Sequence, residues 1–193
     1  DGVERIVRSV GDIFAPVVNA DGTVTYNFEL RDGLKWSDGS DLTAADFEYS
    51  WKRAATDAYD YGYLFEVIDG MDYTGNLNVA ASEDGKTFSV TLTVDVPYFF
   101  ELCAFPTFMP VKKDVVEGNE AWATDPSTYV SNGAYILKSW DHDSQMVFVK
   151  NESYWDAENV TMKQITNYLS DDDVTILGWL KNGQCDFIDT APN

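Results

Sequence analysis

The stretch from residue 30 to residue 53 constrains the fold more than any other part of the chain. Residues 24–30 lead into it and alternate apolar and polar side chains, which is the period of a half-buried β-strand. Asp-Gly pairs follow at 32–33 and 38–39, and they predict two tight turns because glycine adopts positive φ without steric cost. The sequence therefore predicts a strand followed by a connection that turns twice.

A helix start follows the second turn. Thr43 and Asp46 have the spacing of a capping box, with Asp in place of the usual Glu. Phe47, Trp51 and Ala54 then recur at helical spacing, so one face of the predicted helix is apolar. Nothing in this part of the chain is catalytic by itself. The simplest interpretation is a turn-rich connection that buries its aromatic rings.

Residues 26–53, called the signature segment from here on, resemble a long motif of the family 5 extracellular solute-binding proteins. These are the oligopeptide- and dipeptide-binding receptors of ABC importers. The match is long and ordered, which distinguishes it from a single short motif. The residues that match are Tyr26, Phe28, Leu30, Arg31, Gly33, Trp36, Asp38, Gly39, Thr43, Ala44, Asp46, Phe47, Tyr49, Ser50, Trp51 and Arg53.

Further boxes of the same family follow in the family's order. Residues 105–117 match a segment of the form P-x-F-x-P-V-x-K. Residues 151–155 resemble R-N-P-x-Y-W, with Lys150 in place of the arginine and Glu152 in place of the proline. Residues 183–188 resemble a strand of the form G-x-[IV]-D-x-[IV]. The resemblance therefore extends over nearly the whole chain.

The resemblance implies an α+β fold with a mixed sheet, hairpins and peripheral helices. It corresponds to the additional domain plus part of lobe I of a periplasmic-binding-protein type II-like receptor. We expect residues 1–22 to form an N-terminal segment, either in lobe I or as a lead-in hairpin. We expect residues 23–160 to form an α+β domain that carries the signature segment. Residues 161–193 are then a strand-helix-strand unit of lobe I that leads to the hinge.

The resemblance implies a binding protein and no enzyme. Its function would be non-covalent capture of peptides or related small solutes and their delivery to the membrane permease of an ABC importer. Some members bind nickel complexes, haem or sugars, so those ligands stay open. The receptors are much longer and close two lobes around the ligand, so we expect a monomeric fragment that binds only weakly alone. No cofactor is implied.

Aromatic residues gather in the run 58–68. Tyr59, Tyr61, Tyr63 and Phe65 alternate there, and on base rates such rings belong to the core. The alternative is an aromatic wall against a ligand, since tyrosine combines a flat apolar ring with a hydroxyl. In the peptide-binding relatives this region contributes an aromatic residue to the cleft. The resemblance therefore implies Tyr61 and Tyr63 as candidate ligand-binding residues.

A second group of candidates lies in the run that begins at Phe105. Pro106 and Pro110 forbid a regular helix and a central strand there. Irregular segments held by a rigid scaffold often carry binding residues. Phe105, Thr107 and Phe108 are therefore candidate ligand-binding residues, and loop packing is the alternative interpretation.

The composition narrows the class of partner. The 193 residues carry a formal net charge of −20, which disfavours nucleic acids and anionic membranes because binding those requires a basic patch. No apolar run reaches the length of about 18 residues that a transmembrane helix needs. Neither a signal peptide nor a lipidation cysteine is present in this sequence. With the resemblance, we expect an extracytoplasmic protein, either periplasmic or a cell-surface lipoprotein.

The cysteines, the histidine and the run of three aspartates are all expected to have structural and not chemical roles. Cys103 and Cys185 lie far apart, in an apolar run and a predicted buried strand, so we expect two free buried thiols. Zinc would need a second ligand pair. His142 lies in a predicted hairpin turn and is expected to be solvated. The carboxylates at 171–173 precede a predicted helix at 174–182, whose dipole stabilises them.

Two short patterns carry little weight. A calcium loop beginning at Val17 fails, because Val17 and Phe28 would occupy ligand positions that need oxygens. A hairpin turn at 21–22 is the better interpretation. Asn151 and Asn159 each satisfy the N-glycosylation pattern, which is short and often fortuitous.

The competing class of function is a carbohydrate hydrolase. The 33 acidic residues and six tryptophans could build a sugar site with two catalytic carboxylates. No pair of carboxylates stands out by its position, and no Gly-rich phosphate loop, HExxH or GxSxG motif occurs. We therefore predict no catalytic residue and no metal ligand.

Overall fold

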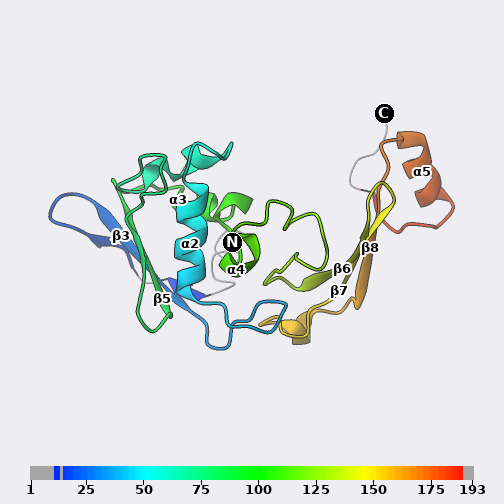
Figure 1. The fold of residues 1–193 in the computed structure, drawn as a ribbon, viewed down its shortest axis with the longest axis horizontal. Coiled ribbons are helices and arrows are strands. Elements are labelled where there is room, and N and C mark those ends of the chain that lie inside the picture. Colours follow the sequence, from blue (N-terminus) through cyan, green and yellow to red (C-terminus); the bar gives the residue numbers. More distant parts are fainter. Residues whose placement is uncertain (1–10, 14, 189–193) are drawn as a thin grey trace.

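The structure is a computed structural model that describes residues 11–13 and 15–188. Within them the strands form two separate sheets, with helices packed beside each (Figure 1). The predicted α+β class is confirmed. Every strand pairing in the described residues is antiparallel, so two antiparallel sheets stand where one mixed sheet was expected. Short hairpin connections account for the pairs β2·β3, β4·β5 and β6·β7, because parallel neighbours would need long crossovers.

The first sheet is built around β3, the strand predicted at 24–30. Its order is β1-β3-β5-β4, and β2 also pairs with β3. Tyr26 lies opposite Val90 and Phe28 opposite Phe88, so the apolar residues of both central strands share one face. Strands β4 and β5 form a hairpin. The bounds are Gly11–Ile13 for β1, Val17–Val18 for β2, Val24–Leu30 for β3, Val79–Ala81 for β4 and Thr87–Leu92 for β5.

The N-terminal hairpin turn is also confirmed. The chain reverses between β2 and β3, and Gly22 has φ +90°, which any other residue would adopt with strain. The side chain of Asp21 accepts hydrogen bonds from the amide and the hydroxyl of Thr23. These contacts use the carboxylate within the turn itself. The rest of the segment 1–22, residues 1–10 and 14, lies outside the described residues.

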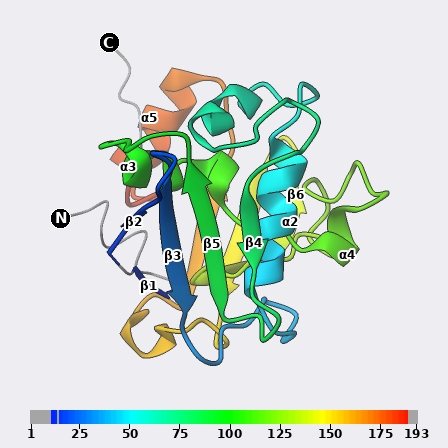
Figure 2. The same cartoon turned by 90° about the vertical axis from the view of Figure 1, so that its left-hand side faces the viewer.

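Helix α2, Ala44–Ala54, covers the apolar face of the first sheet (Figure 2). The predicted capping box is present: Thr43 and Asp46 hydrogen-bond reciprocally at the helix start. Glu48 reaches from the helix to the sheet, where its carboxylate accepts the amide of Ala81 at 2.8 Å. The helix is thus fixed both by its cap and by the edge strand β4.

The two predicted glycine turns lie between β3 and α2. Gly33 has φ +75° and Gly39 has φ +87°, which confirms the expected left-handed backbone. The Trp36 amide donates to the carbonyl of Ser40, and the Gly39 amide donates back to Trp36. This tight turn places the Trp36 ring in the interior, where it has no exposed surface.

Trp51 forms the centre of the core. Its ring centroid lies 4.9 Å from Phe88, 5.0 Å from Phe108 and 5.8 Å from Phe65, in edge-to-face or tilted contacts. Phe47 packs on the same Phe88 ring at 5.9 Å. Burying each large ring contributes on the order of 2–3 kcal/mol. The expected packing of the signature segment into one core is therefore confirmed.

The second sheet has the order β6-β7-β8 and forms the opposite end of the molecule in Figure 1. The predicted hairpin of β6 and β7 is confirmed, with a bulge between Leu137 and Ser139. Strand β8 pairs with β7 across the predicted boundary at residue 160. That division of the chain stays a prediction. The bounds are Tyr135–Asp141 for β6, Gln145–Lys150 for β7, Gln164–Tyr168 for β8 and Asp173–Lys181 for helix α5.

Helix α5 begins at the run of carboxylates at 171–173, as predicted. The side chain of Asp172 accepts the amides of Val174 and Thr175, so this carboxylate caps the helix. The strand expected at 183–188 is wrong, because those residues form no ladder. The amides of Gln184 and Cys185 instead donate back to the carbonyl of Trp179, which extends the helix end.

The signature segment also connects the two sheets. The amide of Ser37 donates to the carbonyl of Ser131 at 2.7 Å, and the amide of Ser131 donates to the hydroxyl of Ser37. The guanidinium of Arg31 lies 4.4 Å from the ring centroid of Trp155. These contacts join the segment after β3 to two connections of the second sheet, the one that leads into β6 and the one between β7 and β8.

The remaining elements are short. They lie in the connections after α2, after β5 and after β7. Their bounds are Gly62–Val67 for the 3₁₀-helix η1, Phe99–Cys103 for α3, Pro106–Phe108 for η2, Lys113–Val116 for α4 and Ala157–Asn159 for η3.

Candidate ligand-binding site

Three candidate residues come together as one exposed group of rings, called the aromatic cluster from here on: Tyr61, Tyr63 and Phe105. The ring centroids of Tyr61 and Phe105 are 5.1 Å apart, and those of Tyr61 and Tyr63 are 6.4 Å apart. Tyr61 is 49% exposed, Tyr63 is 54% exposed and Phe105 is 36% exposed. Two segments more than 40 positions apart in sequence thus share one surface.

Buried neighbours hold both segments of the aromatic cluster in place. Phe65 in η1 and Phe108 in η2 are fully or almost fully buried, and their rings stack with centroids 4.3 Å apart. The indole N–H of Trp51 donates to the carbonyl of Phe108 at 2.9 Å. Because these anchors are packed into the core, the exposed rings beside them sit on a rigid support. Preformed support of this kind lowers the entropic cost of ligand binding.

Gly62 permits the close packing of the tyrosine segment. A Cβ at this position would lie 2.4 Å from the backbone oxygen of Thr56, nearer than atoms can approach. The Gly62 amide donates to the carbonyl of Tyr59 at 3.0 Å and begins η1. The absence of a side chain at Gly62 therefore sets where Tyr61 and Tyr63 emerge.

Tyr59 is exposed but already has a partner. The guanidinium of Arg53, at the end of α2, lies 4.7 Å from the Tyr59 ring centroid. Tyr59 is 40% exposed, so the expectation that the alternating tyrosines belong to the core is wrong for Tyr59, Tyr61 and Tyr63. It is confirmed for Phe65. The 3₁₀ turn of η1 replaces the strand-like alternation that would have buried all four rings.

The other two candidates lie differently. Thr107 is half-buried within η2, next to the aromatic cluster in sequence. The Phe108 ring is only 2% exposed and belongs to the core. Its ring is therefore an anchor of the aromatic cluster. A part for Phe108 in contacting a ligand stays a prediction.

The residues with simple sequence interpretations lie as follows. His142 is in the turn between β6 and β7, where it stacks on Trp140 with centroids 4.2 Å apart. Cys103 and Cys185 are free thiols, and both are half-buried. Burial raises the pKa of the Cys103 thiol, which keeps it protonated and unreactive. Among the residues the structure describes, no cluster of three potential metal ligands occurs.

An open groove near the end of the described chain was not foreseen from the sequence. It has a volume of about 960 Å³ and lies between the second sheet and α5. Trp140, Tyr168 and Trp179 contribute rings to it, and the Tyr168 and Trp179 centroids are 5.5 Å apart. Its lining residues come from β6, β8, α5 and the segments that adjoin them, so no local sequence pattern could reveal it.

Comparison with known proteins decides the class. A profile described as bacterial extracellular solute-binding proteins, family 5 Middle, matches residues 12–193. The chain belongs to this family. The family is one of binding proteins, so the hydrolase alternative is wrong. Within the described residues no helix is long and apolar enough to cross a bilayer.

Named relatives support the same assignment. The oligopeptide-binding protein OppA of Bacillus subtilis is 37% identical over 172 residues, covering 84% of this chain and 32% of that protein. The periplasmic oligopeptide-binding protein OppA of Salmonella typhimurium is 36% identical over 173 residues, covering 83% and 32%. The chain thus spans about a third of the length of these relatives.

Solved structures of the family share the fold. The MppA periplasmic murein tripeptide binding protein, in its unliganded open form, gives a TM-score of 0.83 at 27% identity, covering 95% of this chain and 36% of that one. OppA of Listeria monocytogenes bound to peptide gives 0.79 at 30% identity, covering 96% and 41%. The expected relation to periplasmic-binding-protein type II-like receptors is therefore confirmed.

Proposed function

We propose that this chain forms one wall of the ligand site in a receptor that captures peptides non-covalently for an ABC importer. The family and the names of the relatives support peptides as the ligand class. Nickel complexes, haem and sugars are the alternatives within the family. The receptor would act outside the cytoplasm, as a monomer, and deliver its ligand to a membrane permease, either from the periplasm or from a lipid-anchored position at the cell surface.

The aromatic cluster is the observation that carries this proposal. Three rings with one-third or more of their surface exposed lie on buried anchors, in segments that are otherwise irregular. Exposed apolar groups that are held rigidly favour a binding role over packing. Flat rings accept varied side chains, which suits a receptor for many peptides. Tyr61, Tyr63 and Phe105 would contact the ligand, and Thr107 would offer a hydroxyl beside them.

Backbone amide shifts on titration with a tripeptide test the proposal. The isotope-labelled chain is titrated with trialanine, and we expect shift changes at residues 59–65 and 104–108. One wall alone buries only part of a ligand, so we expect a dissociation constant in the millimolar range, about −4 kcal/mol. The permease and the rest of the receptor are not needed for this measurement.

The matched control is a substitution among the rings that line the groove between the second sheet and α5. Tyr63→Ala should weaken the binding, whereas Tyr168→Ala in β8 should leave it unchanged. Shift changes confined to the groove between the second sheet and α5 would contradict the proposal. Calorimetry that gives submicromolar affinity for this chain alone would contradict the idea that a single wall is present.

A further inference from the structure

We propose that the aromatic cluster selects peptides that carry lysine or arginine side chains over neutral and acidic ones. The inference rests on the proposed function and adds a ligand preference to it. Two independent features of the molecule lead to it: the charge around the aromatic cluster, and the way a neighbouring ring already holds a cation.

The segments that build the aromatic cluster are strongly acidic. Between Arg53 and Lys112 the sequence has a single basic residue, Lys86. The same interval contains nine acidic residues, namely Asp57, Asp60, Glu66, Asp69, Asp72, Glu83, Asp84, Asp95 and Glu101. The imbalance is steeper than in the chain as a whole, which has 13 basic and 33 acidic residues.

The single basic residue of this interval is far from the aromatic cluster. Lys86 precedes β5 and pairs with Asp32 at 2.6 Å. Strand β5 ends at Leu92, which bridges to Ile68 just after η1. Lys86 and η1 therefore lie at opposite ends of β5, the strand seen along its full length in Figure 2. Lys86 is therefore distant from the aromatic cluster, and the basic group beside the tyrosine segment is Arg53, whose guanidinium lies over the ring of Tyr59.

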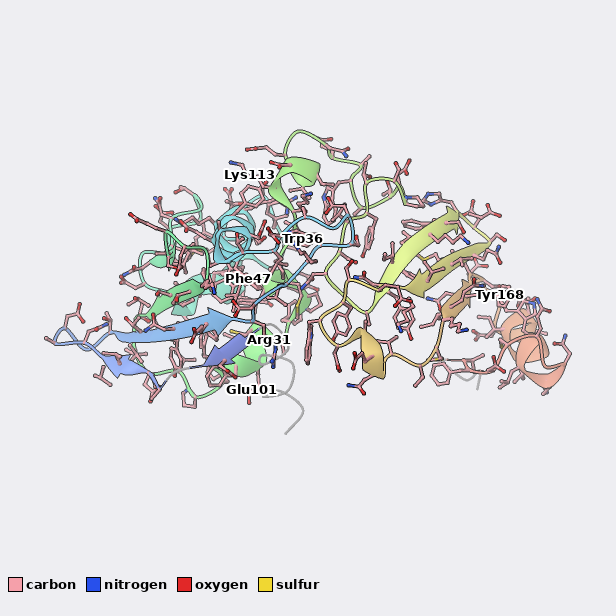
Figure 3. All side chains as sticks on the ribbon, turned by 90° about the horizontal axis from the view of Figure 1, so that it is seen from below. Arg31, Trp36, Phe47, Glu101, Lys113 and Tyr168 are labelled. Atoms are coloured by element: carbon pink, nitrogen blue, oxygen red, sulfur yellow. The ribbon has the colours of Figure 1, made fainter. Side chains whose placement is uncertain are left out.

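Three carboxylates lie close to the rings in the chain and are exposed. Asp60 directly precedes Tyr61 and Glu66 lies in η1. Glu101, which is labelled in Figure 3, lies in α3, four residues before Phe105. Glu66 also accepts a hydrogen bond from the hydroxyl of Tyr73. Same-sign charges around a surface site raise the local concentration of cationic ligands.

Arg53 shows that a ring of this segment binds a cation. Its guanidinium lies over the face of Tyr59, 4.7 Å from the centroid. Tyr61 and Tyr63 belong to the same segment, and their rings are more exposed than that of Tyr59. A lysine or arginine side chain of a peptide could lie over these rings in the same way. The charge and the ring face then act together on one ligand group.

A series of four tripeptides separates charge from size. The central residue is lysine, norleucine, alanine or glutamate between two alanines, and binding is followed by amide shifts of the labelled chain. Norleucine has the length of lysine without its charge. At low salt we expect the lysine peptide to bind about 3- to 10-fold more tightly than the norleucine peptide, and the glutamate peptide to bind most weakly. The differences should shrink at about 0.5 M salt.

Variants assign the preference to its two sources. Tyr63→Leu keeps an apolar side chain without a ring face, so it should weaken binding of the lysine peptide more than binding of the norleucine peptide and thereby reduce the lysine-to-norleucine ratio. Asp60→Asn should reduce the same ratio and its salt dependence. Tyr168→Leu, on the second sheet at the far side of the molecule from Phe47 in Figure 3, should change neither.

The outcomes distinguish the inference from the function beneath it. Equal binding of the lysine and norleucine peptides at low salt, with shifts at 59–65 and 104–108, overturns the preference and leaves peptide capture intact. Tighter binding of the glutamate peptide overturns it equally. No shift at these residues with any of the four peptides overturns the proposed function itself.

Discussion

The indole N–H of Trp51 donates a 2.9 Å hydrogen bond to the backbone carbonyl of Phe108, and the two rings meet edge to face with centroids 5.0 Å apart. One residue of the signature helix thus fixes both the backbone and the ring of η2. Phe105, three positions earlier, emerges from the same short segment into the aromatic cluster. Packing in the core of the signature segment therefore fixes the position of the candidate site.

Trp51→Phe should destabilise the fold. The substitution leaves the buried carbonyl of Phe108 without its donor and removes part of a ring that contacts four others. A lost buried hydrogen bond and a small cavity together cost about 2–4 kcal/mol in free energy of unfolding. Urea denaturation followed by circular dichroism measures the change.

The control for this substitution is an exposed tryptophan. Trp155 is 41% exposed and contacts Arg31 through its ring face, which phenylalanine also offers. Trp155→Phe should therefore change the free energy of unfolding by less than about 1 kcal/mol. Equal losses for Trp51→Phe and Trp155→Phe would show that the hydrogen bond to Phe108 contributes nothing.

Alanine substitution of two glycines should change stability in opposite directions. Gly62→Ala places a Cβ at 2.4 Å from a backbone oxygen, so the turn must shift, at about 1–3 kcal/mol. Gly178 lies inside α5 with open space at its Cβ, so Gly178→Ala should stabilise the fold by about 0.5–1 kcal/mol. Thermal denaturation of both variants checks the signs, and a stabilised Gly62→Ala would contradict the packing described here.

The signature segment was predictable because its determinants are local. Alternation in β3, positive φ at Gly33 and Gly39, and the pairing of Thr43 with Asp46 each act within a few residues. The same is true of the cap at the start of α5. Where local rules agree with each other, the sequence determines the structure with little help from the tertiary fold.

The candidate site was only partly predictable, because its geometry depends on contacts between residues far apart in sequence. Tyr61 and Tyr63 were named from the resemblance, but their exposure depends on η1 and on the absence of a side chain at Gly62. Their contact with Phe105 depends on packing between Phe65 and Phe108, far apart in sequence. Period-two spacing was compatible with a strand, and tertiary contacts chose a 3₁₀ turn instead.

The two glycosylation patterns have different structural settings. Asn151 is 1% exposed; its amide donates to the carbonyl of Gly133 at 2.8 Å, and its oxygen accepts the amide of Ser153. An attached glycan is incompatible with that position. Asn151→Ala should cost about 1–3 kcal/mol in free energy of unfolding, because the carbonyl of Gly133 and the amide of Ser153 both lose their partner.

The matched variant is Asn159→Ala. Asn159 is exposed and its side-chain amide donates to the carboxylate of Asp156 nearby in sequence, so the expected loss in free energy of unfolding is below about 0.5 kcal/mol. Chemical denaturation of both variants measures the difference. If the Asn151 variant were as stable as the Asn159 variant, the buried amide would have no structural part.

The pH dependence of stability should report the contact between the second glycine turn and the segment before α4. Burial disfavours the charged form of Asp38, but hydrogen bonds from Lys112 and Ser40 outweigh it and hold the pKa of Asp38 at about 2, below its ordinary 3.8. A lowered pKa stabilises the fold above pH 3.8, and this contribution is lost as the pH falls toward 2. Asp38→Asn should therefore flatten the loss of stability between pH 4 and pH 2, measured by urea denaturation.

Lys112→Met should flatten the same loss of stability between pH 4 and pH 2, and combining the two substitutions should add little. A wild-type slope in both variants would show that this ion pair does not couple to folding.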